Sequence, residues 1–546
     1  MIQITQLKLP YHHTAVELEN KIRKTLRLSG NQKFTYSIVK KSIDARRKPE
    51  LYLVYTCQVS CENENAIVKK AKQTSVSIVK PKQYVLPEHG EQELVHAPLV
   101  IGAGPAGLFA TLVLVEAGFC PILIERGKPV EARTEDVLKF WETGVLDTAS
   151  NVQFGEGGAG TFSDGKLNTV VKDPANRNLF VLETFVRFGA PEEILFENKP
   201  HIGTDILCQV IANMRNYLLE KGTQVYFETC ATEFVIEDNA ITKVICDNGK
   251  HFSVSAVVLA LGHSARDTFV TLKEKQIPME AKNFAVGFRV EHPQQMMNEA
   301  LYGKQNRNMP AAPYKVTANF PNGRGVYSFC MCPGGYVVNS SSEENRLVVN
   351  GMSYSGRNSS TANSAIIVSV EKKDFTNPFF FTDATKIPEE TDPLAGMHFQ
   401  KALEERAYQL AMGKIPQQLY GDFCDNKPSF AYGDFVSNVK GATAFVNLRG
   451  LLCPDMEESF MQGMEHFAHI IPDFDRRDAI LSGIESRTSS PIRILRDENY
   501  ESSIKGIYPC GEGAGFAGGI TSAAMDGIRV AEAIIRKYKT NKKDEE

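Results

Sequence analysis

Apolar and polar residues follow two different periodicities in the first 85 residues of the 546-residue chain. Apolar residues recur at helical spacing over 15–28, as Leu18, Ile22 and Leu26 illustrate. Two later runs are rich in β-branched and aromatic residues, and the basic turn at 44–49 joins them. With an apolar strand at the start of the chain, the predicted order is β-α-β-β-α-β. The elements after the first strand are expected at 15–28, 34–43, 51–59, 63–72 and 76–79.

A different pattern begins near residue 97, where short continuous apolar runs alternate with helical segments. Runs of this kind are typical of parallel strands that are buried on both faces. We expect strands at 99–101, 121–125, 224–228, 256–261 and 506–510, a hairpin near 247–249, and helices at 108–116, 204–219 and 521–538. Residues 284–474 are expected to be mixed β structure and loop, because Gly, Ser and Asn cluster there.

These patterns divide the chain into an α/β protein of three domains. The order of the first domain is that of the ferredoxin-like α+β fold, which needs no metal. A Rossmann-like domain follows, and a β-rich cap domain is expected as an insertion within it. The predicted ranges are 1–85 for the ferredoxin-like domain, 86–96 for a linker, 97–283 and 481–546 for the two parts of the Rossmann-like domain, and 284–480 for the cap.

Composition and charge narrow the class of protein. The formal net charge is -4, so positive and negative residues nearly cancel. A protein that binds nucleic acid mainly through its overall electrostatic field would need an excess of positive charge. The eleven cysteines lack any C-x-x-C pair, so we expect no metal site and no extracellular fold held by disulfide bonds. The start of the chain lacks the pattern of a secretory signal. We therefore expect a cytoplasmic protein that does not associate with membranes.

A glycine-rich turn after the strand at 99–101 carries the first specific signal. Gly102 permits a tight turn, Gly104 lets the backbone approach a pyrophosphate, and Gly107 lets a helix pack closely on a strand. Glu125 ends the next strand 23 residues after Gly102, where an acid can accept hydrogen bonds from a ribose. The predicted dinucleotide contacts here are Gly102, Ala103, Gly104, Pro105, Ala106, Gly107, Glu125 and Arg126.

A second glycine-rich turn, at 506–521, resembles that of FAD-dependent oxidoreductases of the two-dinucleotide-binding-domain class. In that class an acid after a short strand binds the ribityl chain, and the next helix points its N-terminus at the flavin. The resemblance implies such contacts for Gly511, Glu512, Gly519, Ile520 and Thr521. Glu512 stands where Asp is usual, which leaves its contact open.

Two further segments match parts of the same class. The glycine-rich loop at 151–169 resembles the one that passes the pyrophosphate and the flavin ring, which implies contacts for Gly158, Thr161 and Lys166. Lys166 either offsets negative charge on a reduced flavin or is a solvated surface lysine. Gly262 belongs to a segment that resembles the one closing the flavin domain.

Other candidate residues leave two interpretations open. His263 is either structural or catalytic. Strand alternation is expected to place Cys330 and Cys332 on one face of a strand. They are either a redox pair that meets the flavin or two thiols packed in the sheet. Arg487 and Arg493 form either an anion site or surface salt bridges. No catalytic residue is assigned from the sequence.

Taken together, the motifs resemble an uncharacterised FAD-dependent dehydrogenase family with a ferredoxin-like N-terminal domain. The resemblance implies an FAD-dependent oxidoreductase that transfers hydride between flavin and a small-molecule substrate or NAD(P)H. No second G-x-G-x-x-G appears between Lys199 and Phe474, so NAD(P)H is expected only as a transient electron donor. The alternatives are a flavin-dependent RNA-modifying enzyme, which only the basic turn at 44–49 favours, and a non-catalytic redox sensor or scaffold.

Overall fold

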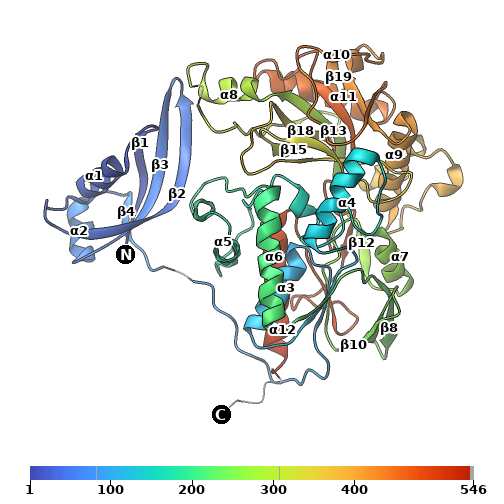
Figure 1. Ribbon diagram of the computed structural model, residues 1–546, viewed down its shortest axis with the longest axis horizontal. Coiled ribbons are helices and arrows are strands. Elements are labelled where there is room, and N and C mark those ends of the chain that lie inside the picture. Colours follow the sequence, from blue (N-terminus) through green and yellow to red (C-terminus); the bar gives the residue numbers. More distant parts are fainter. Residues whose placement is uncertain (82, 307, 541–546) are drawn as a thin grey trace.

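The first domain is a four-stranded antiparallel sheet with two helices on one face. The computed structural model describes residues 1–81, 83–306 and 308–540. The strand order β2-β3-β1-β4 is that of the ferredoxin-like fold, as predicted. The sheet stands apart from the main body, and the hairpin of its two longest strands reaches toward it (Figure 1). Its elements are β1 (Ile2–Pro10), α1 (Ala15–Leu26), β2 (Phe34–Arg47), β3 (Glu50–Cys61), α2 (Glu64–Ala71) and β4 (Val76–Ile78).

A five-stranded parallel sheet forms the centre of the second domain. Its order is β23-β11-β5-β6-β7, and each strand is short and apolar. Val100 and Val258 face one buried cluster while Leu99 and Val257 face another, so both faces of the sheet are covered. The strands are β5 (Leu99–Ile101), β6 (Ile122–Ile124), β7 (Gln224–Tyr226), β11 (Val257–Leu259) and β23 (Ile507–Pro509).

The order of these strands determines where a ligand can bind. From β5 the chain runs to β6 and β7 on one side, and it later adds β11 and β23 on the other. In open parallel sheets, ligands bind outside the carboxyl ends of the strands at such a reversal. Helix α3 (Pro105–Glu116) starts directly after β5, and α12 (Ile520–Lys537) follows the turn after β23. Both helices therefore begin at the expected crevice.

Helices and a small sheet surround the parallel strands. Helix α3 packs between α12 and α6, and a three-stranded antiparallel sheet follows β7 (Figure 1). The hairpin expected near 247–249 joins the last two strands of that sheet. The elements are α4 (Val130–Thr143), α5 (Arg177–Arg187), α6 (Thr204–Glu220), β8 (Ala231–Glu237), β9 (Ala240–Cys246), β10 (His251–Ser253) and α7 (Arg266–Glu274).

A mixed seven-stranded sheet dominates the segment expected to be β structure and loop. The order is β14-β15-β18-β13-β21-β19-β20, and only the β19–β20 pair is parallel. Its strands are β13 (Phe284–Pro293), β14 (Thr317–Asn319), β15 (Gly325–Cys332), β18 (Thr361–Val370), β19 (Ile415–Leu419), β20 (Thr443–Phe445) and β21 (Ile480–Glu485). Two further strand pairs are β12 (Met279–Ala281) with β22 (Ile492–Ile494) and β16 (Tyr336–Asn339) with β17 (Val349–Met352).

Two features of this segment differ from the expectation. It contains long helices in addition to strands. In one of them Phe399, Leu403 and Ala407 recur at helical spacing and are buried. The sequence analysis did not predict this helix, because Gly, Ser and Asn are frequent in the surrounding segment. The predicted return to the Rossmann-like domain at 481 falls inside β21, which pairs with β13 and β19. The return therefore comes after Glu485. The helices are α8 (Gln294–Tyr302), α9 (Ala395–Ala411), α10 (Tyr420–Cys424) and α11 (Pro454–Ala468).

The segment expected to be a linker is bound to the end of the chain's last helix. The amide of Gly90 donates to the Ile535 carbonyl at 2.9 Å, and the amide of Lys539 donates to the Gln92 carbonyl at 2.9 Å. A Cβ on Gly90 would lie 2.3 Å from the Arg536 carbonyl oxygen, so only glycine fits there. Residues near 90 are therefore part of the second domain's surface.

Candidate functional site

One cavity of about 700 Å³ lies at the carboxyl ends of the parallel strands, where the strand order reverses. Segments from four distant parts of the chain line it: the turns before α3 and α12, the glycine-rich loop at 151–169, and the seven-stranded sheet. The predicted residues that line it are Gly102, Gly104, Pro105, Ala106, Glu125, Arg126, Gly158, Lys166, Gly262, Glu512, Gly519, Ile520 and Thr521.

The other four predicted residues lie behind the cavity wall. The buried amide of Ala103 donates to Glu125 Oε2 at 2.8 Å, and the Gly511 amide donates to Asp526 Oδ2 at 2.8 Å. A Cβ on Gly107 would lie 1.8 Å from the Gly102 carbonyl oxygen. Thr161 is fully buried, and its hydroxyl has no hydrogen-bond partner within the described chain. These residues shape the turns rather than line the cavity.

The first glycine turn has the geometry that its sequence predicts. Gly102 has φ of 103°, and a Cβ there would lie 2.3 Å from the Ala260 carbonyl oxygen. Gly104 is the N-cap of α3 and has an ordinary φ of -75°. A Cβ on Gly104 would meet only Gly158 Cα, at 3.8 Å. The N-terminus of α3 is therefore uncapped by any side chain and opens toward the cavity.

Glu125 connects three segments of the cavity wall. Its carboxylate accepts hydrogen bonds from the amides of Ala103 at 2.8 Å, Gly127 at 3.0 Å and Gly155 at 3.0 Å. Arg126 beside it forms two hydrogen bonds with the Asp267 carboxylate and lies over the Phe154 ring at 4.3 Å. The acid thus orders the turn itself, a role that the sequence did not suggest.

Arg133 organises the glycine-rich loop, and the sequence analysis missed it. Its guanidinium is fully buried and donates to the carbonyls of Asn151 at 2.8 Å, Glu156 at 2.7 Å and Val152 at 3.0 Å. Burial lowers the pKa of this arginine to about 10. The available signal was periodicity, because Arg133 occupies a buried position of α4 together with Val137.

The second glycine turn presents another helix N-terminus to the same cavity. Gly519 is the N-cap of α12, has φ of 131° and makes no side-chain cap. A Cβ on Gly262, Gly518 or Gly519 would meet no protein atom within 4 Å. Thr521 holds the start of the helix, since its hydroxyl donates to the Leu167 carbonyl at 2.7 Å. Backbone amides and open glycines thus form a cradle suited to an anionic, ring-containing ligand.

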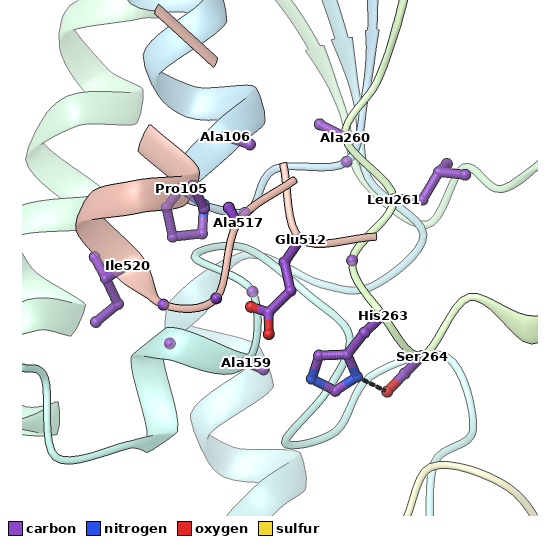
Figure 2. A pocket seen from close by; sticks show the side chains of 18 of the residues that line it. Pro105, Ala106, Ala159, Ala260, Leu261, His263, Ser264, Glu512, Ala517 and Ile520 are labelled. Atoms are coloured by element: carbon purple, nitrogen blue, oxygen red, sulfur yellow. Dashed lines mark hydrogen bonds between the residues drawn. The ribbon is translucent and has the colours of Figure 1, made fainter. Parts of the chain in front are cut away.

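Glu512 and His263 project from neighbouring loops into this pocket (Figure 2). Burial raises the pKa of Glu512 to about 7, against the opposing charge of Lys282. Burial, together with the nearby charges of Arg487 and Arg266, lowers the pKa of His263 to about 3. The imidazole is therefore neutral at pH 7, and its Nδ1 lies 3.0 Å from Ser264 Oγ. This geometry gives His263 a hydrogen-bonding role and makes it a weak base.

Lys166 is one-third exposed, and its ammonium is held by other groups of the chain. Its ammonium lies 3.0 Å from Asp164 Oδ2 and donates to the Met331 carbonyl. Burial opposes its charge, but Asp164 and the two nearby cysteines raise its pKa, so the side chain is charged at pH 7. Lys282 is a second cation on the cavity wall that the sequence analysis missed, and it donates to Ser489 Oγ at 2.6 Å.

The arginines expected to form an anion site do not do so together. Arg487 lines the cavity, but its guanidinium binds the fully buried Glu404 at 2.7 and 2.9 Å. Glu404 also binds Arg266, at 2.8 and 2.9 Å. Glu343 lies 2.5 Å from Arg266 and 3.4 Å from Arg487, so two carboxylates balance the two guanidiniums within this network. Arg493 does not line the cavity and lies 3.8 Å from Glu280.

Cys330 and Cys332 end β15 beside the cavity. The ladder between β15 and β18 shifts register between Phe329 and Cys332, which interrupts the expected strand alternation. Cys330 has φ of 42° and lines the cavity, whereas Cys332 is fully buried. The two thiols therefore do not share one exposed face.

The basic turn of the first domain uses most of its charges within the molecule. Arg46 binds Asp44 at 2.8 and 2.9 Å, and Lys41 binds Glu197 at 2.9 Å. Lys48 donates to the Ala300 carbonyl.

Within the described residues, His, Cys, Asp and Glu side chains form no cluster able to hold a metal ion. No helix in the described part of the chain has the length and apolar character needed to cross a membrane.

The chain is similar to another protein over nearly its whole length, and two of its segments match family models. Residues 283–488 match the family described as FAD-dependent protein, C-terminal domain-like, and residues 1–60 match a domain of unknown function. An uncharacterized protein of Clostridium beijerinckii is 42% identical over 544 residues, which are 98% of this chain and 99% of that protein.

The chain also shows distant similarity to solved structures. E. coli quinol fumarate reductase is 12% identical, with a TM-score of 0.36, over 81% of this chain and 69% of that chain. The flavin-dependent brominase Bmp2 is 13% identical, with a TM-score of 0.36, over 81% of this chain and 78% of that chain. L-amino acid deaminase from Proteus vulgaris is 13% identical, with a TM-score of 0.31, over 84% of this chain and 98% of that chain.

Proposed function

The chain belongs to one protein family with the uncharacterized Clostridium beijerinckii protein, and from this premise we propose that it is an FAD-dependent oxidoreductase. The FAD-dependent family description of residues 283–488 supports this proposal. The observation that carries it is the meeting of two uncapped helix N-termini, α3 and α12, at one glycine-walled cavity. One N-terminus suits a pyrophosphate, and the other suits the electron-rich edge of a flavin.

The residues present fit FAD at both ends of the cavity. The amides at the start of α3, beside Gly104 and Gly158, would hold the pyrophosphate. Glu125 has room for a ribose hydroxyl, since its three known hydrogen bonds leave acceptor capacity. Gly519 and Thr521 would face the flavin ring. Bound FAD would supply the ability to accept and release a hydride.

The chain's own side chains define the place of a small-molecule substrate. Lys282, Ser489 and Asn350 line the cavity, and the charge of Lys282 acts on Glu512. They come from the turn before β13, the segment after β21 and strand β17. The Lys282 ammonium can orient an anionic group, and the neutral His263 can donate or accept one hydrogen bond. The enclosing sheet would exclude water from this end. NAD(P)H would enter only transiently, as donor or acceptor.

An anaerobic titration of the purified protein tests the proposal. We expect FAD to be released from the denatured protein at about one per chain, and NADH or NADPH to bleach the oxidised flavin absorbance. Bleaching by neither nucleotide, with FAD present, would turn the search to small organic anions as reductants. A purified chain without flavin, which also fails to take up added FAD, would contradict the proposal.

A further inference from the structure

The chain bends sharply at Cys330, where β15 meets the cavity. Cys330 has left-handed backbone, with φ of 42°, although it is not a glycine. The Cys332 thiol donates to the Cys330 carbonyl oxygen at 3.3 Å, so the chain folds back between the two cysteines. Backbone strain of this kind persists where the surrounding structure holds it, and it is concentrated at functional sites.

Two cations bind the backbone of this bend. Arg289 donates to the Cys330 carbonyl oxygen at 2.8 Å, and its Nη1 lies 3.9 Å from Cys332 Sγ. Lys166 donates to the carbonyl of Met331, the residue between the cysteines. The Cys332 thiol, Lys166 and Arg289 together lower the pKa of Cys330. A thiolate is the reactive form of cysteine in disulfide exchange and redox chemistry.

The cysteines lie at the flavin end of the cavity. Cys330 lines it together with Lys166 and Glu512, and the charges of Cys330 and Glu512 interact. Cys332 lies directly behind, fully buried and shielded from solvent. The Cys330 thiol is thus accessible from the cavity, and it interacts with the thiol of the buried Cys332.

We propose that Cys330 and Cys332 are a redox-active pair that exchanges two electrons with FAD, an inference that rests on the proposed function. In the oxidising direction two S–H bonds break and one S–S bond forms between the sulfurs. The two electrons and two protons convert FAD to FADH₂, so the reaction balances without another oxidant. In the reverse direction FADH₂ reduces the disulfide. The enzyme would then store four electrons per chain.

The bend makes such a disulfide feasible. In a flat strand, residues two apart have Cα atoms about 6.6 Å apart, near the upper limit for a disulfide. Here the register shift after Phe329 takes both cysteines out of the flat ladder, and the Cys332 thiol already reaches back to the Cys330 carbonyl oxygen at 3.3 Å. A short disulfide of this kind is strained and therefore easily reduced, as an electron-exchanging pair requires.

Electron counting on the intact flavoprotein tests the pair. Air-oxidised wild type, titrated anaerobically with dithionite, should consume four electrons per FAD. Cys330→Ser and Cys332→Ser should each consume two, and Cys424→Ser, which removes an exposed thiol elsewhere, should still consume four. Consumption of two electrons per FAD by wild type would overturn the inference while leaving the proposed function intact.

Mass spectrometry of wild type gives a second readout that needs no variant to fold. Trypsin cleaves after Arg324 and Arg346, so both cysteines fall in the single peptide 325–346, which contains no other cysteine. After air oxidation and alkylation without reductant, this peptide should carry no alkyl group. Its mass should be lower than that of the reduced, unalkylated peptide by two hydrogen atoms. After dithionite it should carry two alkyl groups. Two alkyl groups in both samples would refute the pair, and wild type that binds no FAD would refute the proposed function itself.

Discussion

Gly104 and Gly107 belong to one motif but have different structural constraints. A Cβ on Gly107 would collide with the Gly102 carbonyl at 1.8 Å, so this glycine is required by the fold itself. Gly104 has an ordinary φ, and a Cβ there would make only normal contact with Gly158. The space beside Gly104 is therefore open to a ligand. The fold requires glycine at position 107 but not at position 104.

This difference predicts the behaviour of Gly104→Val. Its side chain should fill the space beside the α3 N-terminus and weaken FAD binding at least about tenfold, which is a loss of about 1.4 kcal/mol. Its free energy of unfolding without FAD should stay within about 0.5 kcal/mol of wild type. Flavin absorbance per chain and urea unfolding measure the two effects. Gly107→Ala is the contrasting variant and should unfold more easily; full flavin occupancy in Gly104→Val would contradict the assignment.

Glu512 predicts a pH dependence of stability. Its pKa is raised to about 7 in the folded chain, from an ordinary 4.5, so the folded state binds the proton more tightly than the unfolded state. The stabilisation is complete below pH 4.5 and is lost as the pH rises through about 7. In flavin-free protein, the free energy of unfolding of wild type should therefore fall between pH 5 and pH 8. Glu512→Gln should make this fall smaller by about 1–2 kcal/mol, a range that includes a reduction for screening by solvent.

Urea unfolding at these two pH values measures the effect on the same protein. Glu458→Gln, a change to a carboxylate on the exposed side of α11, is the matched control and should leave the decline unchanged. An equal decline in Glu512→Gln and wild type would show that Glu512 titrates at its ordinary pKa.

At the scale of elements, close contact between α3 and α12 brings the two turns to one cavity. Gly527 of α12 lies against α3, where a Cβ would come within 2.1 Å of the Ala106 carbonyl oxygen. Asp526 beside it accepts from the Gly511 amide at 2.8 Å and binds Arg496 at 2.7 Å. The second helix is thereby fixed to both glycine turns.

Gly527→Ala should therefore separate the helices and affect both motifs. We expect a destabilisation of about 1–3 kcal/mol, typical of overpacking in a core, together with weaker FAD binding. Gly30→Ala is the control, because a Cβ there meets nothing within 4 Å. Calorimetry and flavin absorbance per chain check both results. Unchanged stability would show that α12 can shift away from α3 at little cost.

Elements with local signals could be predicted from the sequence, whereas long-range pairings could not. The turn at Gly102 and the order of the first domain follow from short stretches of chain. In contrast, β13 pairs with both β18 and β21, and Glu404 of α9 binds arginines from two other segments. No local pattern encodes such partners. Lys282 was missed for this reason, since its partner Ser489 is 207 residues away in the chain.

At the scale of the whole molecule, the first domain and the body that holds the cavity have separate cores. Ile4, Ile22 and Val59 belong to a cluster confined to the first domain. The two units meet through contacts of the β2–β3 hairpin, such as Lys41 with Glu197 and Asn306 with the Pro49 carbonyl. Tyr84, near the end of the first domain's predicted range, also packs on the second unit, with its ring 4.5 Å from that of Phe180. Leu51 alone joins the core of the seven-stranded sheet as a fully packed member. The cavity takes no residue from the first domain.

Removal of residues 1–85 should therefore leave FAD binding intact. The shortened chain keeps Gly90 and Gln92, whose hydrogen bonds with Ile535 and Lys539 secure the end of α12. We expect the same FAD per chain as wild type, with stability lowered by about 1–3 kcal/mol through exposure of the docking surface. A chain cut after residue 96 is the comparison, and it should lose further stability because α12 loses those hydrogen bonds. If removal of residues 1–85 alone released the flavin, the hairpin contacts at Glu197 and Asn306 would have to position the cavity walls as well.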